Sequence, residues 1–272
     1  MPAYLPAFGF IVIRVGVAGI LFALCNFLLV KQKIDLKEDL FKIILCAITG
    51  CGANMLLFFK GLSITTPING AILMACTPVF VVVFATFLIR EKLTLLKYVG
   101  IGVACLGAIL LLGGLHFTFD AKNIWGDMAV ALNAIIYSFY LVYAKPLLKK
   151  YHPITLSAYT FGIGFLFVLP FGFNELKQTN FQVIPMEIWG YILFILLGAT
   201  FLAYLLNAYA LSKASASMVG SYIYLQPVMA IIIAIIHHTD TISFEKVIYM
   251  LIIFAGVYLV NRKTKEIAVA TT

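Results

Sequence analysis

The sequence predicts an all-α membrane protein, an inverted repeat of five-helix halves with a ten-helix architecture of which nine spans are visible. Hydrophobic residues make up 63% of the chain and charged residues 11%, and the mean hydropathy is +1.07. Soluble globular proteins are roughly 45–50% apolar and about 25% charged. Two further observations support this fold class: a series of long apolar runs, and an internal similarity at a constant offset of 149 residues.

The apolar runs are about 20 residues long, the length that a helix needs to cross ~30 Å of hydrocarbon. Polar breaks separate the runs: residues 31–39 are charged, 116–125 are polar and aromatic, 145–153 are basic, and 174–185 form the longest hydrophilic loop. We expect no soluble domain and no cleavable signal, because the N-terminal stretch lacks a basic region. The nine predicted spans are residues 6–30, 41–60, 67–89, 95–115, 126–147, 154–173, 187–208, 215–237 and 245–261.

The internal similarity joins residues 61–107 to residues 210–256 without a gap. The first stretch reads GLSITTPINGAILMACTPVFVVVFATFLIREKLTLLKYVGIGVACLG. A proline, a turn acid and a late glycine all fall in register, which indicates an internal duplication. The matched pairs are Leu62 and Leu211, Ser63 and Ser212, Pro78 and Pro227, Val79 and Val228, Glu91 and Asp240, Lys97 and Lys246, and Gly107 and Gly256.

The offset also predicts the limits of the two halves. The span 126–147 has its partner position just ahead of Met1, so we expect the first helix of the first half to be absent from this chain. The halves are then residues 1–115 and 126–261, followed by a tail at 262–272. Halves of five helices cross the membrane in opposite senses, as in many secondary transporters, where the substrate site lies near the midplane between the halves.

The distribution of Lys and Arg predicts the orientation. One set of alternate breaks holds fourteen of these residues and the other set holds four. Because cytoplasmic loops carry the excess of Lys and Arg, we expect a multi-pass protein of the cytoplasmic membrane with its C-terminus in the cytoplasm. The net charge of +8 comes from these short breaks, so nucleic acid is not expected as a partner.

The cysteines do not suggest metal chemistry. All five lie inside apolar runs of the first half, with no CxxC and no Cys/His spacing that suits a metal. We therefore interpret them as packing residues and expect no metal and no cofactor. They are Cys25, Cys46, Cys51, Cys76 and Cys105.

Polar side chains in the middle of spans are costly in hydrocarbon unless they face a cavity or a partner. Three of them in span 126–147 recur at positions i, i+4 and i+7 and share one face. Thr77 and Gln226 directly precede Pro78 and Pro227, two prolines that can kink a helix and suit a gate. The candidate substrate-binding residues, which could converge on one chamber, are Asn54, Thr77, Asn133, Tyr137, Tyr140, Tyr204, Asn207, Tyr222 and Gln226.

Each candidate also has a structural interpretation. Asn54 can simply bridge two helices, where such bonds average less than ~1 kcal/mol. The prolines Pro78 and Pro227 can be tolerated without any gating role. Tyr143 near a span end fits the interfacial belt, and Asn69 can cap the helix that begins nearby.

Charged residues near the membrane have similar alternatives. Arg14 lies well inside an apolar run, where it either snorkels towards the outer interface or meets an anionic substrate. Glu91 is interpreted as a first-turn acid of span 95–115. Asp127, at a helix start, is the near-span acid with a plausible depth and gives little support for proton coupling.

The longest repeated phrases resemble the EamA-type branch of the drug/metabolite transporter superfamily. They are FKGLSITTPINGAILMACTPVFVVVFATFLIREKLT, LNAYALSKASASMVGSYIYLQPVMAIIIA and WGDMAVALNAIIYSFYLVYAKPLL. The resemblance implies metabolite transport, usually export, by alternating access and without an ATP-binding module. Two features depart from the family pattern: the first helix is missing, and Asp240 replaces a Glu.

Three functions are compatible with these features. We favour a secondary exporter of small metabolites such as amino acids, with a homodimer left open, because the candidate residues are neutral and aromatic. An intramembrane enzyme would need a nucleophile, base or metal set, and none appears inside the spans, so we expect no enzyme. The alternative is a non-transporting membrane scaffold or receptor built on a transporter fold.

Overall fold

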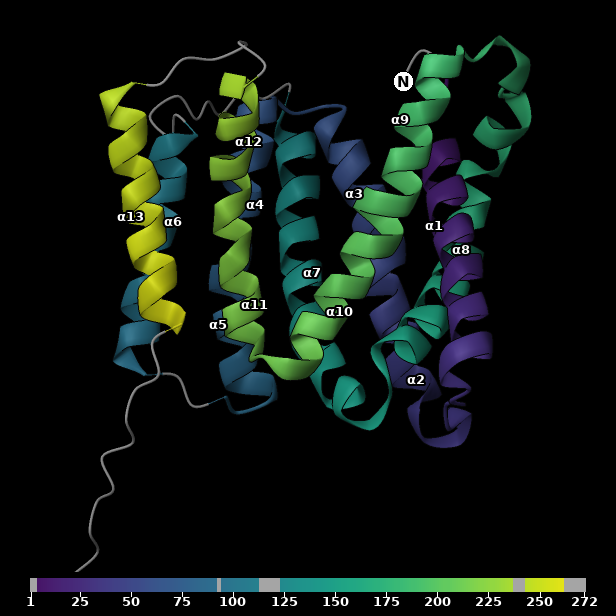
Figure 1. Ribbon diagram of the computed structural model, residues 1–272, viewed down its shortest axis with the longest axis horizontal. Helices are drawn as coiled ribbons and strands as arrows, with labels where there is room; N and C mark the ends of the chain where they lie inside the picture. Colours follow the sequence, from purple (N-terminus) through teal and green to yellow (C-terminus); the bar gives the residue numbers. More distant parts are fainter. Residues whose placement is uncertain (1–3, 92–93, 113–122, 237–242, 262–272) are drawn as a thin grey trace, which may run out of the picture.

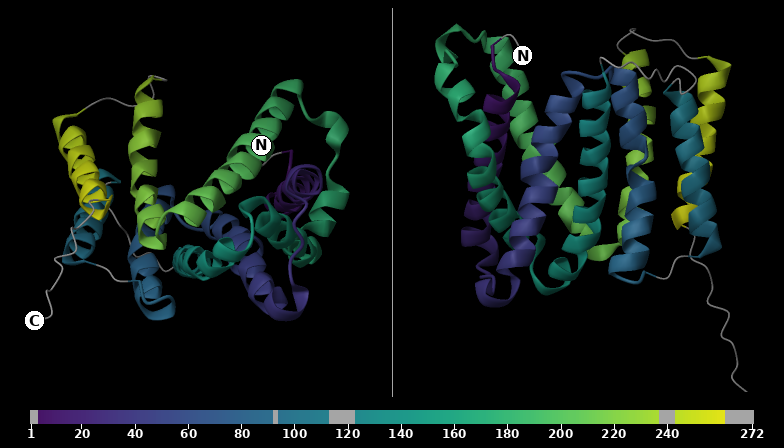
Figure 2. Two further views of the ribbon diagram at one scale, coloured as in Figure 1. Left: turned by 60° about the horizontal axis from the view of Figure 1, so that its bottom comes forward. Right: turned by 180° about the vertical axis from the view of Figure 1, so that it is seen from behind.

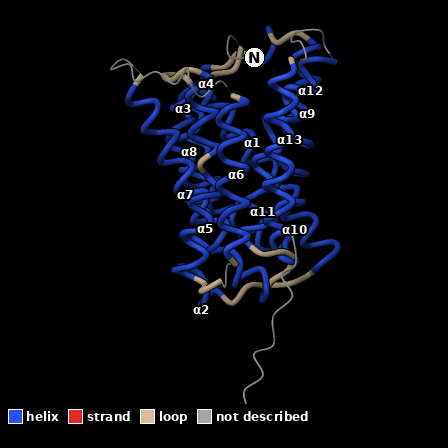
Figure 3. Tube along the Cα trace, turned by 90° about the vertical axis from the view of Figure 1, so that its left-hand side faces the viewer, coloured by secondary structure: helices blue, strands red, loops and turns tan. Residues whose placement is uncertain are grey.

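The computed structural model describes residues 4–91, 94–112, 123–236 and 243–261 as helices and short connections (Figure 1). The connections gather at the two ends of the bundle, as a membrane-crossing chain requires (Figure 3). The helices, with short π-helical and 3₁₀ segments labelled η, are α1 (Ala7–Cys25), η1 (Asn26–Val30), α2 (Leu36–Ala47), η2 (Ile48–Gly52), α3 (Ala53–Leu62), α4 (Pro67–Ala75), α5 (Thr77–Leu88), α6 (Leu95–Leu111), α7 (Ile124–Lys150), α8 (Pro153–Gln178), η4 (Phe181–Val183), α9 (Met186–Leu196), η5 (Leu197–Leu202), α10 (Ala203–Lys213), α11 (Ala216–Ser221), η6 (Tyr222–Tyr224), α12 (Leu225–Ile236) and α13 (Phe244–Asn261).

These pieces join into nine rods within the described residues. The segments η1, η2, η5 and η6 continue the helices beside them, and α5 follows α4 directly after Cys76. Eight rods are long and apolar enough to span a membrane, and the ninth, α6, is an apolar helix of 17 residues. Each of the nine predicted spans corresponds to one rod. The predicted tail at 262–272 lies outside the described residues, as does Asp240.

Some rods extend beyond the predicted spans. The second rod begins at Leu36 rather than at 41, because the Asp35 carboxylate caps it by accepting from the backbone N–H groups of Lys37 (3.0 Å) and Glu38 (3.4 Å). The helix α8 continues to Gln178 rather than 173. A span predicted from hydropathy ends where charged residues begin, whereas the backbone hydrogen bonds of the helix continue through those charged residues.

Helices related by the repeat pack against each other. A shift of 149 residues moves α6 onto α13 and moves α1 with η1 onto α8 to within a few residues. These two pairs make the most extensive helix contacts in the described structure and lie at opposite ends of the molecule (Figure 2). In Figure 1, α1 runs downwards and α8 upwards, and α6 runs upwards and α13 downwards. The pairs are antiparallel, as inverted halves require.

The π-helical segments also recur at the repeat offset of 149 residues. The π segment η2 begins at Ile48 and the π segment η5 begins at Leu197, which are 149 residues apart. Both interrupt a spanning helix near its middle. Segments of this kind are rare and occur frequently at functional sites.

The two halves differ in burial. Half of the most apolar window of the rod Leu36–Leu62 is buried, against 17% for its repeat partner Met186–Lys213. The difference follows from α7, which packs against α3, α4 and α5, whereas no described helix covers the second half in the same way. Apolar side chains such as Phe194 and Leu206 are exposed there. That a further helix completes the first half remains a prediction.

Glycines set the close approach of α6 and α13. A Cβ added to Gly100 would lie 2.7 Å from the carbonyl oxygen of Gly256, and one added to Gly256 would lie 2.6 Å from the carbonyl oxygen of Gly100. Gly102, on the same helix, has open space around its Cβ position. Small residues of this kind let membrane helices pack backbone against backbone.

Replacing Gly100 or Gly256 by Ala should therefore separate α6 from α13 and lower the stability by about 1–3 kcal/mol, as overpacking does. The matched control is Gly102→Ala, which adds the same methyl group to open space and should leave the stability unchanged. Thermal unfolding of the detergent-purified variants measures both. Equal melting temperatures for Gly100→Ala and Gly102→Ala would show that the contact does not hold the pair together.

Candidate functional site

Three tyrosines and an asparagine gather in the middle of the bundle, and we call them the tyrosine cluster: Tyr137, Tyr140, Tyr204 and Asn207. The Asn207 side-chain amide on α10 donates to the Tyr137 hydroxyl on α7 over 3.0 Å. The rings of Tyr137 and Tyr140 are stacked, with centroids 6.0 Å apart. Tyr137 lies midway along α7, so the cluster is far from either end of the span.

The tyrosine cluster contacts the first half at the π segment η2. The Tyr204 hydroxyl donates to the Gly50 carbonyl oxygen at 3.5 Å, and the Tyr204 ring meets Phe161 edge-on at 4.9 Å. The Tyr140 ring packs so closely on Gly50 that a Cβ added to Gly50 would overlap the ring. The cluster is therefore held at the boundary between the two halves.

Two other polar residues of α7 join the halves at the same boundary: Asn133, which the sequence analysis selected, and Ser138, which it did not. The Asn133 side-chain amide donates to the backbone oxygen of Asn54 over 2.6 Å. The Ser138 hydroxyl donates to the backbone oxygen of Thr77 over 2.9 Å. Asn54 and Thr77 thus contribute backbone carbonyls to these two bonds, while the Thr77 hydroxyl oxygen is buried without a partner among the described residues.

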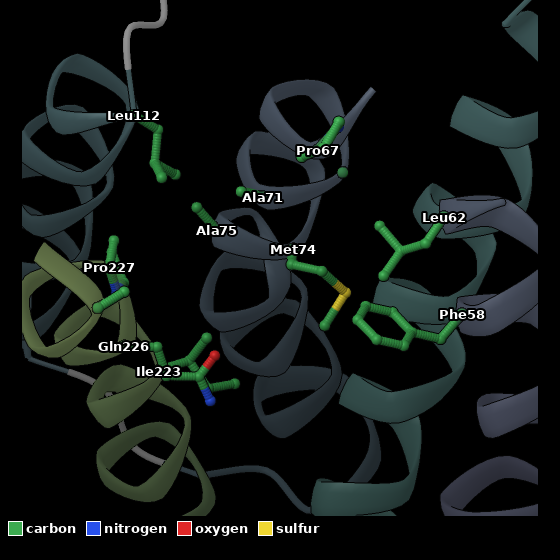
Figure 4. Close-up of a pocket in the computed structure, with 12 residues that line it drawn as sticks. Phe58, Leu62, Pro67, Ala71, Met74, Ala75, Leu112, Ile223, Gln226 and Pro227 are labelled. Carbon is green, nitrogen blue, oxygen red and sulfur yellow. The ribbon is translucent and has the colours of Figure 1, made fainter. Parts of the chain in front are cut away.

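Gln226 and Pro227 lie elsewhere, in a pocket of about 380 Å³ between the halves (Figure 4). Its lining comes from α3, α4, α6, η6 and α12 and is apolar apart from the Gln226 amide. No member of the tyrosine cluster lines this pocket, and Tyr222 is half exposed and does not line it either. The structure thus separates Gln226 and Pro227 from the tyrosine cluster, and Tyr222 belongs to neither group. The lining residues are Phe58, Leu62, Pro67, Gly70, Ala71, Met74, Ala75, Leu112, Ile223, Gln226, Pro227 and Ala230.

The prolines sit at helix junctions. Pro78 is among the first residues of α5, directly after the break at Cys76 that ends α4. Pro227 is in the first turn of α12, after the 3₁₀ segment η6. A proline in the first turn removes an N–H that has no partner within its own helix, so both positions are favourable for it.

Polar bonds also join the halves at the end of the bundle that carries the α1–α2 and α7–α8 connections. The buried Asp39 carboxylate accepts from Lys150 (2.7 Å), Lys42 (2.6 Å) and the Tyr151 hydroxyl (2.8 Å). Lys150 also pairs with Glu38 at 2.8 Å, but the Glu38 side chain is 67% exposed. Asp39 is therefore the buried centre of this contact.

The interpretation of Glu91 as a first-turn acid is wrong. The helix α6 begins at Leu95 with no acid in its first turn, because Arg90 takes a left-handed conformation (φ 50°) and turns the chain before the helix. The Glu91 carboxylate instead accepts from the hydroxyl of Ser217 on α11 and lies 3.5 Å from the Lys97 ammonium. This is a further polar link between the halves.

Asn69 does not cap α4 with its side chain. Thr66 is the N-cap, and its hydroxyl accepts from the Asn69 backbone N–H over 3.1 Å. The Asn69 amide reaches the buried Asp127 carboxylate at 3.3 Å, and the Thr65 hydroxyl also donates to that carboxylate. Asp127 therefore ties the start of α7 to the α3–α4 connection.

Sequence reasoning missed Thr200. The Arg14 guanidinium Nε donates to the Thr200 hydroxyl over 3.0 Å, which joins α1 to η5. A single threonine in an apolar run gives no signal of such a contact. Among the described residues, no group of three or more His, Cys, Asp or Glu side chains could hold a metal ion.

Asp39→Ala should lower the stability of the protein by roughly 1–3 kcal/mol, because it leaves three donors without their buried acceptor. Glu38→Ala removes an exposed partner of the same Lys150 and should cost at most about 1 kcal/mol. Thermal unfolding in one detergent compares the two variants. A similar loss of stability in both variants would contradict the conclusion that Asp39 is the main acceptor in this contact.

Comparisons with known proteins agree with this architecture. A model of the EamA-like transporter family matches residues 1–113 and again residues 124–262. An "Uncharacterized transporter" of Archaeoglobus fulgidus is 30% identical over 210 residues, which cover 76% of this chain and 71% of the relative. A "Probable terminal-alkyne amino-acid exporter" of Streptantibioticus cattleyicolor is 26% identical over 84% of this chain and 75% of its own length.

A solved crystal structure has the same fold, with a TM-score of 0.77 over 94% of this chain and 88% of the other, at 17% identity. The family and these named relatives are transporters rather than enzymes, so the expected small-molecule substrate and lipid bilayer apply to this chain. The chain is a multi-pass membrane protein that belongs to the EamA-like transporter family.

Proposed function

We propose that the protein is a secondary transporter that exports small metabolites, amino acids in particular, by alternating access across the cytoplasmic membrane. The observation that carries the proposal is the tyrosine cluster, which lies at mid-span on the boundary between the two inverted halves. Substrate sites of inverted-repeat transporters are formed at this place. The halves that would move are residues 1–115 and 126–261.

The chemistry of the candidate residues supports amino acids or similar amphipathic compounds. The cluster offers hydroxyl and amide groups beside aromatic rings, and its four members carry no formal charge. The separate pocket at Gln226 and Pro227 has an apolar lining with one amide, that of Gln226, which suits an aliphatic or aromatic side chain. The exporter from Streptantibioticus cattleyicolor, a relative named for amino acids, adds support.

The described structure suggests one state of the transport cycle. Asp39 with Lys150, and Glu91 with Ser217, link the halves at the end of the bundle to which α13 descends in Figure 1. The basic residues of the α1–α2, α5–α6 and α7–α8 connections lie at this same end, which we assign to the cytoplasm. The state would then be closed to the cytoplasm. Nucleic acid plays no part in this function, and a homodimer is compatible with it.

A non-transporting scaffold or receptor is the alternative, and the exposed apolar face of the rod Met186–Lys213 favours it to some degree. Such a face can bind another membrane helix without any transport. A scaffold does not depend on the polar groups of the tyrosine cluster, and this difference separates the two functions.

The test is a flux assay in proteoliposomes with pooled labelled amino acids and nucleobases. Tyr137→Phe and Asn207→Leu each break the hydrogen bond at the centre of the cluster and should reduce flux at least tenfold, because an amide or hydroxyl is left unpaired in the site. The assay should include the chain extended by a first helix taken from a relative, to cover the exposed second half.

The matched control is Tyr258→Phe, which makes the same chemical change on the exposed side of α13 and should leave flux unchanged. All variants must insert and purify like the parent chain. Flux that persists in both cluster variants would show that the substrate does not bind at the tyrosine cluster. If neither the chain nor its extended form transports any compound in the pool, the scaffold function is favoured.

A further inference from the structure

Arg14 is a charged residue within a spanning helix that has no acidic partner in the described structure. It lies on α1, seven residues after the helix begins at Ala7. The described ion pairs use Lys42, Lys97 and Lys150 as their cations, and none includes Arg14. An ionised side chain inside a membrane is costly and usually marks the path of a substrate or ion.

The protein holds the guanidinium in a fixed place. Its Nε donates to the Thr200 hydroxyl at 3.0 Å, and Thr200 in turn donates to the Ile195 carbonyl oxygen at 2.7 Å. The guanidinium carbon lies 5.5 Å from the centre of the Phe59 ring and 5.9 Å from that of Phe10. The hydrogen bond fixes one edge of the guanidinium, and the two rings lie within cation–π distance of it, so these contacts restrict its orientation without any ligand.

Most of its hydrogen-bonding capacity is still unused. An arginine side chain has five N–H donors, and Thr200 is its one hydrogen-bond acceptor among the described residues. The four donors on the two terminal nitrogens form the fork that binds a carboxylate with two parallel bonds. These four donors are therefore available to a carboxylate.

The position also connects Arg14 to the proposed substrate path. Thr200 belongs to the π segment η5, and Tyr204 of the tyrosine cluster is four residues further along the same rod. Arg14 and Thr200 come from different halves, so the site lies on the boundary that the cluster occupies.

We propose that Arg14 binds the carboxylate group of the transported compound, so that the substrates are small monocarboxylates, amino acids among them. This inference rests on the proposed transport function and deepens it. Thr200 is the positioning residue that orients the fork, and the Phe10 and Phe59 rings lie within cation–π distance of the guanidinium. The aliphatic or aromatic part of the substrate would lie against the rings of the cluster.

Equilibrium binding to the purified chain in nanodiscs tests the assignment apart from flux. The probes are matched sets that differ in the carboxylate: L-leucine and 4-methylpentanoate against L-leucinamide and 4-methylpentanamide, with the corresponding phenylalanine set. Both carboxylates of a set should bind at least tenfold more tightly than their amides. Arg14→Gln should abolish this difference, and Arg14→Lys should retain part of it, because a lysine keeps the charge but not the fork.

Arg90→Gln is the matched control, since Arg90 is an exposed arginine in a connection and its loss should leave every affinity unchanged. Thr200→Val should weaken carboxylate binding without changing amide binding. The proposal is overturned if carboxylates and amides bind the parent chain equally, or if Arg14→Gln keeps the difference. If carboxylates bind in a way that depends on Arg14 but the chain transports none of them, the carboxylate site stands and the proposed transport function is contradicted.

Discussion

Hydrocarbon supplies no hydrogen-bond partner, so every polar group inside the spans must find one within the protein or its ligand. Asn133 and Ser138 donate to backbone carbonyls of the first half, and Lys145 donates to the carbonyls of Leu211 and Ala214 at the end of α10. These bonds fix how α7 sits against its neighbours. Arg14 meets the requirement only in part, through one hydroxyl, which is why its remaining donors point to a ligand.

The repeat provides the frame for these contacts. The antiparallel pairs α1 with α8 and α6 with α13 close the two ends of the molecule, and glycines at Gly100 and Gly256 let one pair approach at backbone distance. Between the pairs, hydrogen bonds cross from one half to the other at both ends of the bundle and at mid-span, among them those from Thr65 to Asp127, from Asn133 to Asn54 and from Lys150 to Asp39. Rocking of one half against the other, as in other inverted-repeat transporters, would require these bonds to break and form again.

Sequence patterns predicted the spans, the offset and the inverted halves, because hydrophobic length and repeated motifs are local properties. The face shared by Tyr137 and Tyr140 also followed from helical periodicity. The π segments, the contact of Arg14 with Thr200 and the link from Glu91 to Ser217 did not, since they depend on how distant helices pack. The separation of Gln226 from the tyrosine cluster has the same origin.

Asp39 and Glu91 link the two halves at one end of the bundle. Alternating access, which we propose for this protein, requires the halves to separate at that end during transport. Spin labels at the exposed positions Arg90 and Lys213, in a chain whose five cysteines are replaced by alanine, report the distance between the halves at that end. Pulsed electron resonance in liposomes should find two distance populations, with the longer one enriched in the Asp39→Ala variant. A single distance, the same in both proteins, would contradict alternating access.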